Sequence, residues 1–150
     1  MNLAQYIVEA TQEVFTTMLM EEVSAGAPLE TRNERFSDSI SSIVGMAGAN
    51  KGAVAVHSPV NVACRITELF LGMEVESLDD DVKDAMGELA NMITGNVKGK
   101  LEEQGQDIRL SIPTTVDGDN YTVECPGKHE GTIVPFSFQD CRFLVEIHFE

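Results

Sequence analysis

The stretch that decides the fold is residues 78–101, which reads LDDDVKDAMGELANMITGNVKGKL. Apolar residues recur in it every three or four positions, so one face of a helix formed here would be apolar. We expect this face to contact the core, and it comprises Met86, Leu89, Ala90, Ile93, Val97 and Leu101. Ser77 is a possible N-cap, and three aspartates at positions 79–81 would interact favourably with the helix dipole. The pattern therefore predicts a long amphipathic helix.

The opposite face of this helix carries a line of residues spaced three or four positions apart, namely Asp84, Glu88, Asn91, Gly95 and Lys98. Three glycines lie on or beside the line, at Gly87, Gly95 and Gly99. A glycine inside a helix costs about 1 kcal/mol relative to alanine, so three of them on one face suggest a purpose. Their small size would leave Glu88 and Asn91 clear for another backbone to approach. The alternative is an ordinary solvated face that tolerates glycine.

The motif Asp84-x-x-x-Glu88-x-x-Asn91, followed by Pro113, resembles the signature of the CheX/CheC family of phosphatases. These proteins act on phosphorylated CheY-type response regulators. The run GELANMI at residues 87–93 and the segment IRLSIPT at residues 108–114 are similar to the CheX branch in particular. The resemblance covers most of the chain, from the first helix to the last strand. It implies a CheC-like fold and a phosphatase that hydrolyses the phospho-aspartate of a response regulator.

The resemblance also implies roles for individual residues. Asn91 would orient a water molecule in line with the phosphorus atom, because its carboxamide can donate and accept hydrogen bonds at once. Glu88, one turn earlier, would form an ion pair with the regulator's lysine. The residues implied as further docking contacts are Asp84, Gly87, Gly95 and Lys98. The alternative for Asp84 is a first-turn carboxylate that only stabilises the helix. We expect a structural role for Pro113, which would terminate or bend the strand beside the helix.

Expectations for cofactors and partners follow from the same resemblance. The phosphorylated regulator brings its own divalent metal ion (Mg²⁺), so no cofactor is expected in this chain. Signal termination in chemotaxis or a related two-component pathway is the implied role. CheX-type relatives dimerise through their sheets, so we expect a homodimer, with predicted strands at residues 121–125 and 131–138 as candidate interfaces. The alternatives are a non-enzymatic module that binds a regulator or flagellar-switch component, and a purely structural dimer.

The composition is that of one globular domain covering residues 1–150, with 43% hydrophobic and 23% charged residues. The net charge of −15 argues against nucleic-acid binding, which needs basic patches. No apolar run approaches the roughly 20 residues of a membrane span, and the N-terminus does not read as a signal peptide. Cys64, Cys125 and Cys141 form no C-x-x-C pair and are expected to be free thiols. We therefore expect a cytoplasmic protein that binds no membrane.

The rest of the chain predicts helices and strands on both sides of the 78–101 helix. In order, these are a helix at 3–22, strands at 36–47 and 53–57, a helix opened by Ser58-Pro59 and ended by Gly72, and strands at 108–116, 121–125, 131–138 and 142–149. This order predicts an α+β fold with a mostly antiparallel sheet. The N-terminal helix and the tandem pair of helices would pack on that sheet.

The predicted first helix holds a second copy of the motif's spacing, Gln5-x-x-x-Glu9-x-x-Gln12. CheC-type relatives carry two active helices, whereas CheX-type relatives carry one. Gln12 stands where the motif has asparagine, and no glycines flank it, so we predict that this copy is not catalytic. A coincidence of three common residue types is the other explanation.

No other motif in the sequence predicts a self-contained active site. His57, His129 and His148 lie on different predicted elements without the spacing of metal ligands. His148 should face away from the core, and residues 117–120 are expected to form a turn rather than a calcium loop. Motifs for a serine nucleophile or a phosphate-binding glycine loop are missing as well. This fits a protein whose reaction centre is supplied by its substrate.

Overall fold

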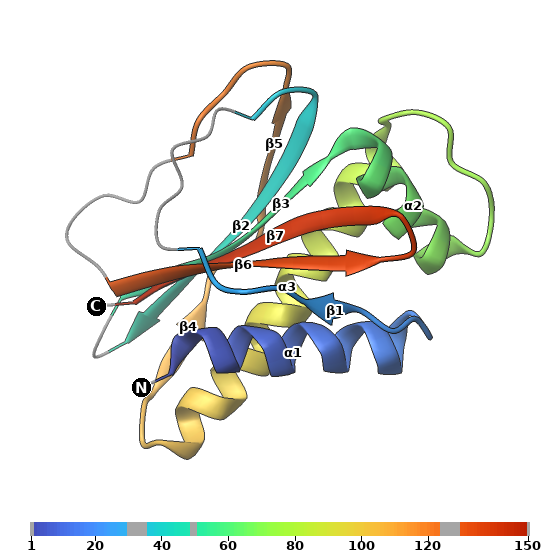
Figure 1. Cartoon of the computed structure of the whole chain (residues 1–150). Helices are drawn as coiled ribbons and strands as arrows, with labels where there is room; N and C mark the ends of the chain where they lie inside the picture. Colours follow the sequence, from blue (N-terminus) through green and yellow to red (C-terminus); the bar gives the residue numbers. More distant parts are fainter. Residues whose placement is uncertain (1, 30–35, 49–50, 124–129, 150) are drawn as a thin grey trace.

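The structure, a computed structural model, describes residues 2–29, 36–48, 51–123 and 130–149. Within these ranges, helices pack against a seven-stranded antiparallel sheet (Figure 1). The elements are α1 (Leu3–Met18), β1 (Ser24–Ala25), β2 (Ser39–Gly48), β3 (Gly52–Pro59), α2 (Val60–Leu71), α3 (Asp80–Glu103), β4 (Ile108–Leu110), β5 (Thr114–Gly118), β6 (Glu130–Phe138) and β7 (Cys141–Phe149). The strand order is β1-β6-β7-β3-β2-β4, and β5 also pairs with β2. The predicted fold class is confirmed.

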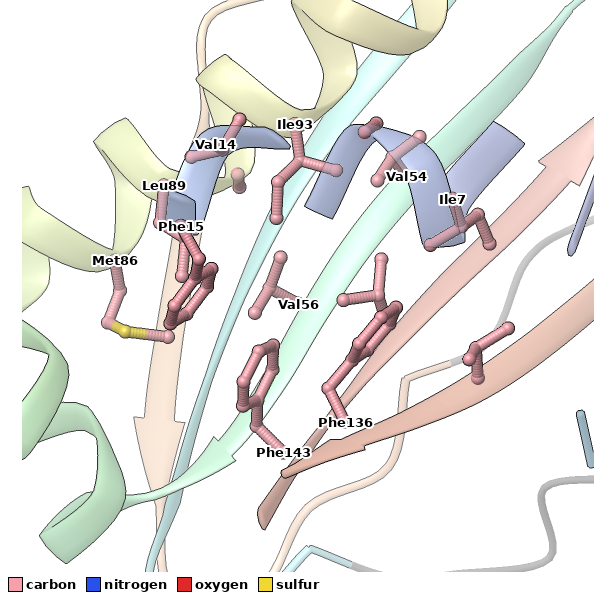
Figure 2. Packing of buried hydrophobic residues seen from close by; sticks show 14 of the residues in the cluster. Ile7, Val14, Phe15, Val54, Val56, Met86, Leu89, Ile93, Phe136 and Phe143 are labelled. Carbon is pink, nitrogen blue, oxygen red and sulfur yellow. The ribbon is translucent and has the colours of Figure 1, made fainter. Parts of the chain in front are cut away.

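The core lies between the sheet and the two longest helices, α1 and α3. Every residue of the predicted core face of α3 has an exposed fraction of 0%: Met86, Leu89, Ala90, Ile93, Val97 and Leu101. Figure 2 shows Met86, Leu89 and Ile93 in the same cluster as Phe15 of α1 and Val56 of β3. The 3.6-residue period therefore identified the inner face of α3 correctly, and this also fixes which residues form its outer face.

The first helix is shorter than predicted, because it ends at Met18 rather than near residue 22. The backbone N–H groups of Leu19 and Glu21 both donate to the carbonyl of Phe15, and Met20 adopts a positive φ of 55°. These contacts close the helix. The freed chain then forms β1, a short strand that the sequence did not predict.

Two of the predicted helix starts are also displaced. The extended chain of β3 continues to Pro59, which is itself the N-cap of α2, and the Ser58 hydroxyl donates to a carbonyl instead of capping the helix. Asp79, not Ser77, caps α3, because its carboxylate accepts a hydrogen bond from a first-turn N–H at 3.1 Å. The predicted end of α2 is confirmed, since Gly72 has the left-handed φ of 70° that glycine adopts easily.

The predicted strand at residues 108–116 is two strands, β4 and β5, which both pair with β2. Residues 111–113 interrupt it, and Pro113 in this break lacks the N–H needed to continue a ladder. The strand predicted at 121–125 is wrong as far as residue 123, because Tyr121 forms only an isolated bridge with Phe36. Residue 124 and Cys125 lie outside the described residues.

The outer edge of β6 is paired within the chain. Ser24 and Ala25 of β1 pair with Ser137 and Phe136, and the connector continues this pairing with an N–H from Leu29 to the Ile133 carbonyl at 2.7 Å. The prediction that residues 131–138 offer a free edge for dimerisation is therefore wrong for residues 133–137. The sequence pattern missed this because two strand residues leave no detectable alternation.

Candidate functional site

The predicted site residues lie along the outer face of α3. Asp84, Glu88 and Gly95 are exposed, while Asn91 and Lys98 are half-buried. Glu88 and Asn91 are three residues apart on one continuous helix, so their Cβ atoms are about 5–6 Å apart. The structure therefore brings an exposed carboxylate and an accessible carboxamide together in the middle of a helix whose inner face is rigidly packed.

The side chains of Glu88 and Asn91 have no hydrogen bond or ion pair with any described residue. Their neighbours differ: Lys83 pairs with Asp117 at 3.6 Å, and Lys98 lies 4.0 Å from Glu102. The carboxylate and the carboxamide are thus available to a partner molecule, whereas the lysines beside them have intramolecular partners.

The glycines of α3 fall into two groups. A Cβ on the buried Gly87 would lie 3.5 Å from the Cβ of Pro113 and 3.6 Å from the hydroxyl of Thr115. The prediction that Gly87 leaves room for a docking partner is wrong, because the chain's own β4–β5 segment occupies that space. A Cβ on Gly95 or Gly99 would meet nothing within 4 Å, so these two do leave the helix surface open.

The edge strand β5 holds the first half of α3 in place. Thr115 packs beside Gly87 and also shares a hydrogen bond of 2.8 Å with Ser42 of β2. The Lys83–Asp117 ion pair joins the first turns of α3 to the same strand. Pro113 therefore lies next to the helix turn that precedes Glu88, which fits the structural role expected for it.

In the α1 copy of the motif's spacing, the polar side chains form hydrogen bonds and an ion pair with other residues of the chain. The Gln5 amide donates to the Glu9 carboxylate at 2.8 Å, and the Lys100 ammonium lies 3.1 Å from the other oxygen of Glu9. These two contacts, the Gln5 hydrogen bond first, lower the pKa of Glu9 from its ordinary value of 4.5. Gln12 donates to the Val23 carbonyl at 3.4 Å. These polar groups already have partners, unlike Glu88 and Asn91.

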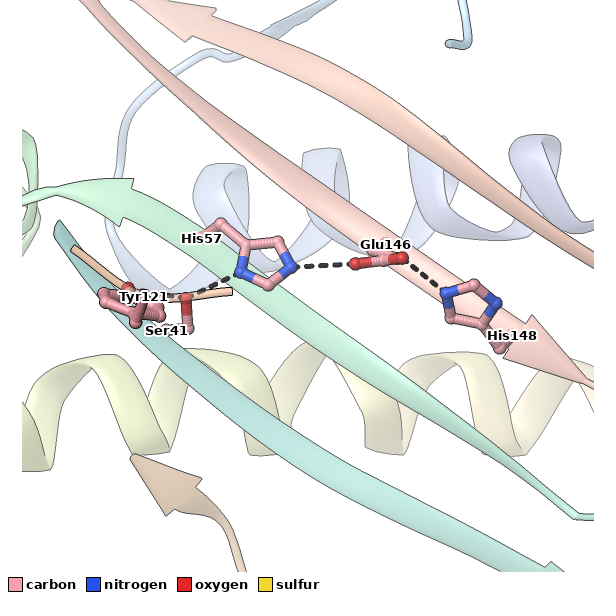
Figure 3. A network of polar contacts seen from close by, with 5 residues as sticks. All are labelled: Ser41, His57, Tyr121, Glu146 and His148. Atoms are coloured by element: carbon pink, nitrogen blue, oxygen red, sulfur yellow. Dashed lines mark hydrogen bonds and ion pairs between the residues drawn. The ribbon is translucent and has the colours of Figure 1, made fainter. Parts of the chain in front are cut away.

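A second polar cluster lies on the sheet face opposite α1 and α3 (Figure 3). Nδ1 of His57 is 2.7 Å from the Ser41 hydroxyl, and its Nε2 is 2.9 Å from Glu146. Glu146 also contacts His148, and Tyr121 contacts the Ser41 hydroxyl at 2.9 Å. The sequence patterns did not predict this cluster. Its one sequence signal is a glutamate placed between the apolar residues of β7.

The cluster has the serine–histidine–carboxylate order of a hydrolase triad, but its burial excludes that chemistry. Ser41 is 0% and His57 1% exposed, so a substrate cannot reach the hydroxyl. The ring of Phe36 also stacks on His57 with centroids 4.5 Å apart. We conclude that the cluster is structural and connects β2, β3 and β7 to the segments around Phe36 and Tyr121.

Other predicted features carry no site in the part of the chain that the structure describes. No group of three or more histidine, cysteine or acidic side chains there could hold a metal ion, and no helix there is long and apolar enough to cross a membrane. Cys64 and Cys141 are free and buried, and burial raises the pKa of both thiols. Cys125 and His129 lie outside the described residues.

Comparison with known proteins identifies the family. The model of the family described as "Chemotaxis phosphatase CheX" matches residues 40–137, a stretch that contains all of α3 and Pro113. This chain belongs to the CheX family. Both the Glu88–Asn91 pair and the segment that packs against Gly87 thus lie inside the matched region.

Individual relatives agree with this membership. The CheY-P phosphatase CheX of Thermotoga maritima is 25% identical over 122 residues, which cover 81% of this chain and 79% of that protein. A CheC-like superfamily protein from a Shewanella species has a TM-score of 0.89 and 30% identity, covering 100% of this chain and 99% of that one. A chain of a CheX–CheY–BeF3–Mg²⁺ complex from Borrelia burgdorferi has a TM-score of 0.84 and 25% identity, with 99% and 98% covered.

Proposed function

We propose that this CheX-family protein accelerates hydrolysis of the phospho-aspartate of a CheY-type response regulator, and so ends its signal in chemotaxis or a related two-component pathway. The observation that carries the proposal is the pair of Glu88 and Asn91, one turn apart on the outer face of α3 and without a described partner. The family description and the name of the Thermotoga maritima relative support the phosphatase activity. The Borrelia burgdorferi complex supports a CheY-type partner.

In this proposal Asn91 positions the attacking water. The carboxamide oxygen accepts a hydrogen bond from the water, and the NH2 group can donate to a phosphoryl oxygen. The water attacks phosphorus in line, the bond from phosphorus to the aspartate oxygen breaks, and inorganic phosphate leaves. Positioning is the main contribution a protein can make to phosphoryl transfer, since little covalent work is required. In this proposal the regulator binds the divalent metal ion, and this chain contributes no ligand to it.

In the same proposal, Glu88 fixes the position along α3 at which the regulator docks. Its exposed carboxylate would pair with the lysine of the regulator's site, about 5–6 Å along the helix from Asn91. Asp84, Gly95 and Lys98 continue the same line and would contact the surface around that site. The accessible Gly95 lets the partner's backbone come close. The net charge of −15 is compatible with docking onto a basic group.

The test is phosphate release from a phosphorylated CheY-type receiver, with wild-type protein and with Asn91→Ala. We expect wild type to accelerate release and Asn91→Ala to return it to the receiver's own rate, with an unchanged circular-dichroism spectrum because the side chain lies outside the core. Acceleration that survives the substitution would overturn the assignment of Asn91. Binding without acceleration would instead favour the alternative, a module that docks a regulator without hydrolysis.

The homodimer remains part of the proposal. Its interface has to lie elsewhere than the β6 edge at residues 133–137, which is already paired. Sedimentation velocity at micromolar concentration measures it directly: a species of twice the chain mass of 16.4 kDa supports the dimer, and a species of that mass alone contradicts it.

A further inference from the structure

Ile112, in the break between β4 and β5, is exposed to 85%. A large apolar side chain that stays in water gives up the free energy that burial would provide. The preceding strand β4 contains a buried Ile108 and a half-buried Leu110, so the segment has access to the core. Ile112 is thus an outward-facing apolar residue in a region where inward packing is possible.

The backbone around Ile112 is fixed on both sides. The Ser111 N–H donates to the Gly45 carbonyl at 2.9 Å, and the Gly45 N–H donates to the Ser111 hydroxyl at 2.8 Å. On the other side Pro113 packs against the Gly87 position of α3. Contacts with β2 and α3 thus hold Ser111 and Pro113, the two neighbours of Ile112. Because this backbone is already ordered, a partner that binds Ile112 would cause only a small further loss of backbone entropy.

Ile112 lies within reach of a partner that docks on Glu88. Pro113 touches the Gly87 position and Glu88 is the next residue, so the Cα atoms of Ile112 and Glu88 are at most about 14 Å apart. A standard interface buries about 800 Å² on each partner, which is a patch of roughly 16 Å radius. An interface centred on Glu88 therefore extends far enough to include Ile112.

We propose that Ile112 is an apolar docking contact for the phosphorylated receiver domain, inserted against an apolar patch beside the receiver's phosphorylation site. The inference rests on the proposed function and deepens it. Glu88 and Asn91 engage groups that every receiver of this class carries, so they distinguish poorly among receivers. Ile112 would contact the receiver outside these shared groups, and it would contribute to receiver affinity through the Michaelis constant rather than through the maximal rate.

The experiment measures phosphate release against receiver concentration for Ile112→Asp and Ile112→Val. We expect Ile112→Asp to raise the half-saturating receiver concentration about tenfold or more and to change the maximal rate less than about twofold. Ile112→Val keeps an apolar side chain and should stay within about twofold of wild type. Thermal unfolding of each variant checks that the fold is intact.

Met20→Asp is the matched control, because Met20 is also 85% exposed and aspartate tolerates its positive φ. The adjacent Glu21 contacts Gln139 in the β6–β7 turn, which lies three to four strand spacings, or about 14–19 Å, across the sheet from β5. We expect Met20→Asp to match wild type. An equal rise in both aspartate variants would mean a non-specific effect of charge and would overturn the inference.

The same measurements distinguish a failure of the Ile112 contact from a failure of the proposed phosphatase activity. If release depends on Asn91 but Ile112→Asp behaves like wild type, the phosphatase stands and the Ile112 contact is wrong. If wild type fails to accelerate release, the phosphatase proposal fails, and binding to a receiver activated with beryllofluoride and Mg²⁺ decides about Ile112. If Ile112→Asp then binds the receiver tenfold more weakly than wild type, the contact is supported. If the two proteins bind equally well, or if wild type does not bind at all, the contact is rejected.

Discussion

Helices α1 and α3 carry the same spacing of polar side chains, but among the described residues the glutamate and amide side chains have intramolecular partners only in α1. Both helices pack an apolar face on the sheet, and both place a glutamate three residues before an amide side chain. In α1 the glutamate is bound by Gln5 and Lys100, and the amide of Gln12 donates to a backbone carbonyl. In α3 neither Glu88 nor Asn91 has a described partner.

This difference shows that spacing alone does not define a site. A motif becomes available for recognition only when the chain leaves its polar groups without intramolecular partners and leaves space around them. On α3 the space comes from Gly95, where an added Cβ would meet nothing within 4 Å. Matched substitutions in the two helices test whether this contrast has functional consequences.

The largest effect on receiver binding should come from removing the glutamate of the α3 copy. Glu88→Ala should raise the half-saturating receiver concentration about tenfold or more, because a charge-assisted contact contributes roughly 1.5–3 kcal/mol. Glu9→Ala, the matched control on α1, should leave the kinetics unchanged. Steady-state phosphate release measures both. A Glu88→Ala variant that alters only the maximal rate would refute the anchoring role.

A smaller effect is expected from filling the open space on α3. Gly95→Ala should stabilise the helix by up to about 1 kcal/mol, which raises the melting temperature by about 2–4 °C. It should also weaken receiver binding several-fold, since the added methyl group occupies the approach path. Gly99→Ala, which is equally free of contacts, is the control and should stabilise the protein without weakening binding. Unchanged binding by Gly95→Ala would mean that this glycine serves no partner.

The smallest effect concerns the ionisation of Glu9 on α1. Its pKa is lowered, so its contribution to stability is present above the ordinary value of 4.5 and is lost as the pH falls through the folded-state pKa. The Gln5 hydrogen bond and the Lys100 ammonium both lower this pKa, so Gln5→Ala and Lys100→Met should each raise the pKa of Glu9 toward its ordinary value. Nuclear magnetic resonance titration of the Glu9 carboxyl group measures both shifts. An unchanged pKa in either variant would mean that the contact removed in that variant does not act on Glu9.

The parts of the fold that were predicted correctly depend on local signals. The 3.6-residue period assigned the inner and outer faces of α3, so the exposure of Glu88 followed from its sequence position. Gly72 ended α2 as expected, because a left-handed helix terminus favours glycine. The strands predicted at 131–138 and 142–149 agree closely with β6 and β7, which pair on either side of Gln139. None of these features requires knowledge of distant contacts.

The parts that were missed depend on contacts between distant residues. The burial of Gly87 follows from the position of Pro113, which only the pairing of β4 and β5 with β2 determines. The hydrogen bonds of His57 to Ser41 and Glu146 join three strands. Local patterns carry no information on such pairings. The roles of Glu88 and Asn91 in catalysis stay predictions, because they depend on contacts with a partner molecule.

The most direct test of the account compares Asn91→Ala on α3 with Gln12→Ala on α1 at saturating phosphorylated receiver. The account predicts that Asn91→Ala loses the acceleration, by on the order of 100-fold or more, as expected for removing one positioning group. Gln12→Ala should keep the wild-type rate. Full activity of Asn91→Ala, or an equal loss in both variants, would contradict the claim that the α3 copy alone positions the attacking water.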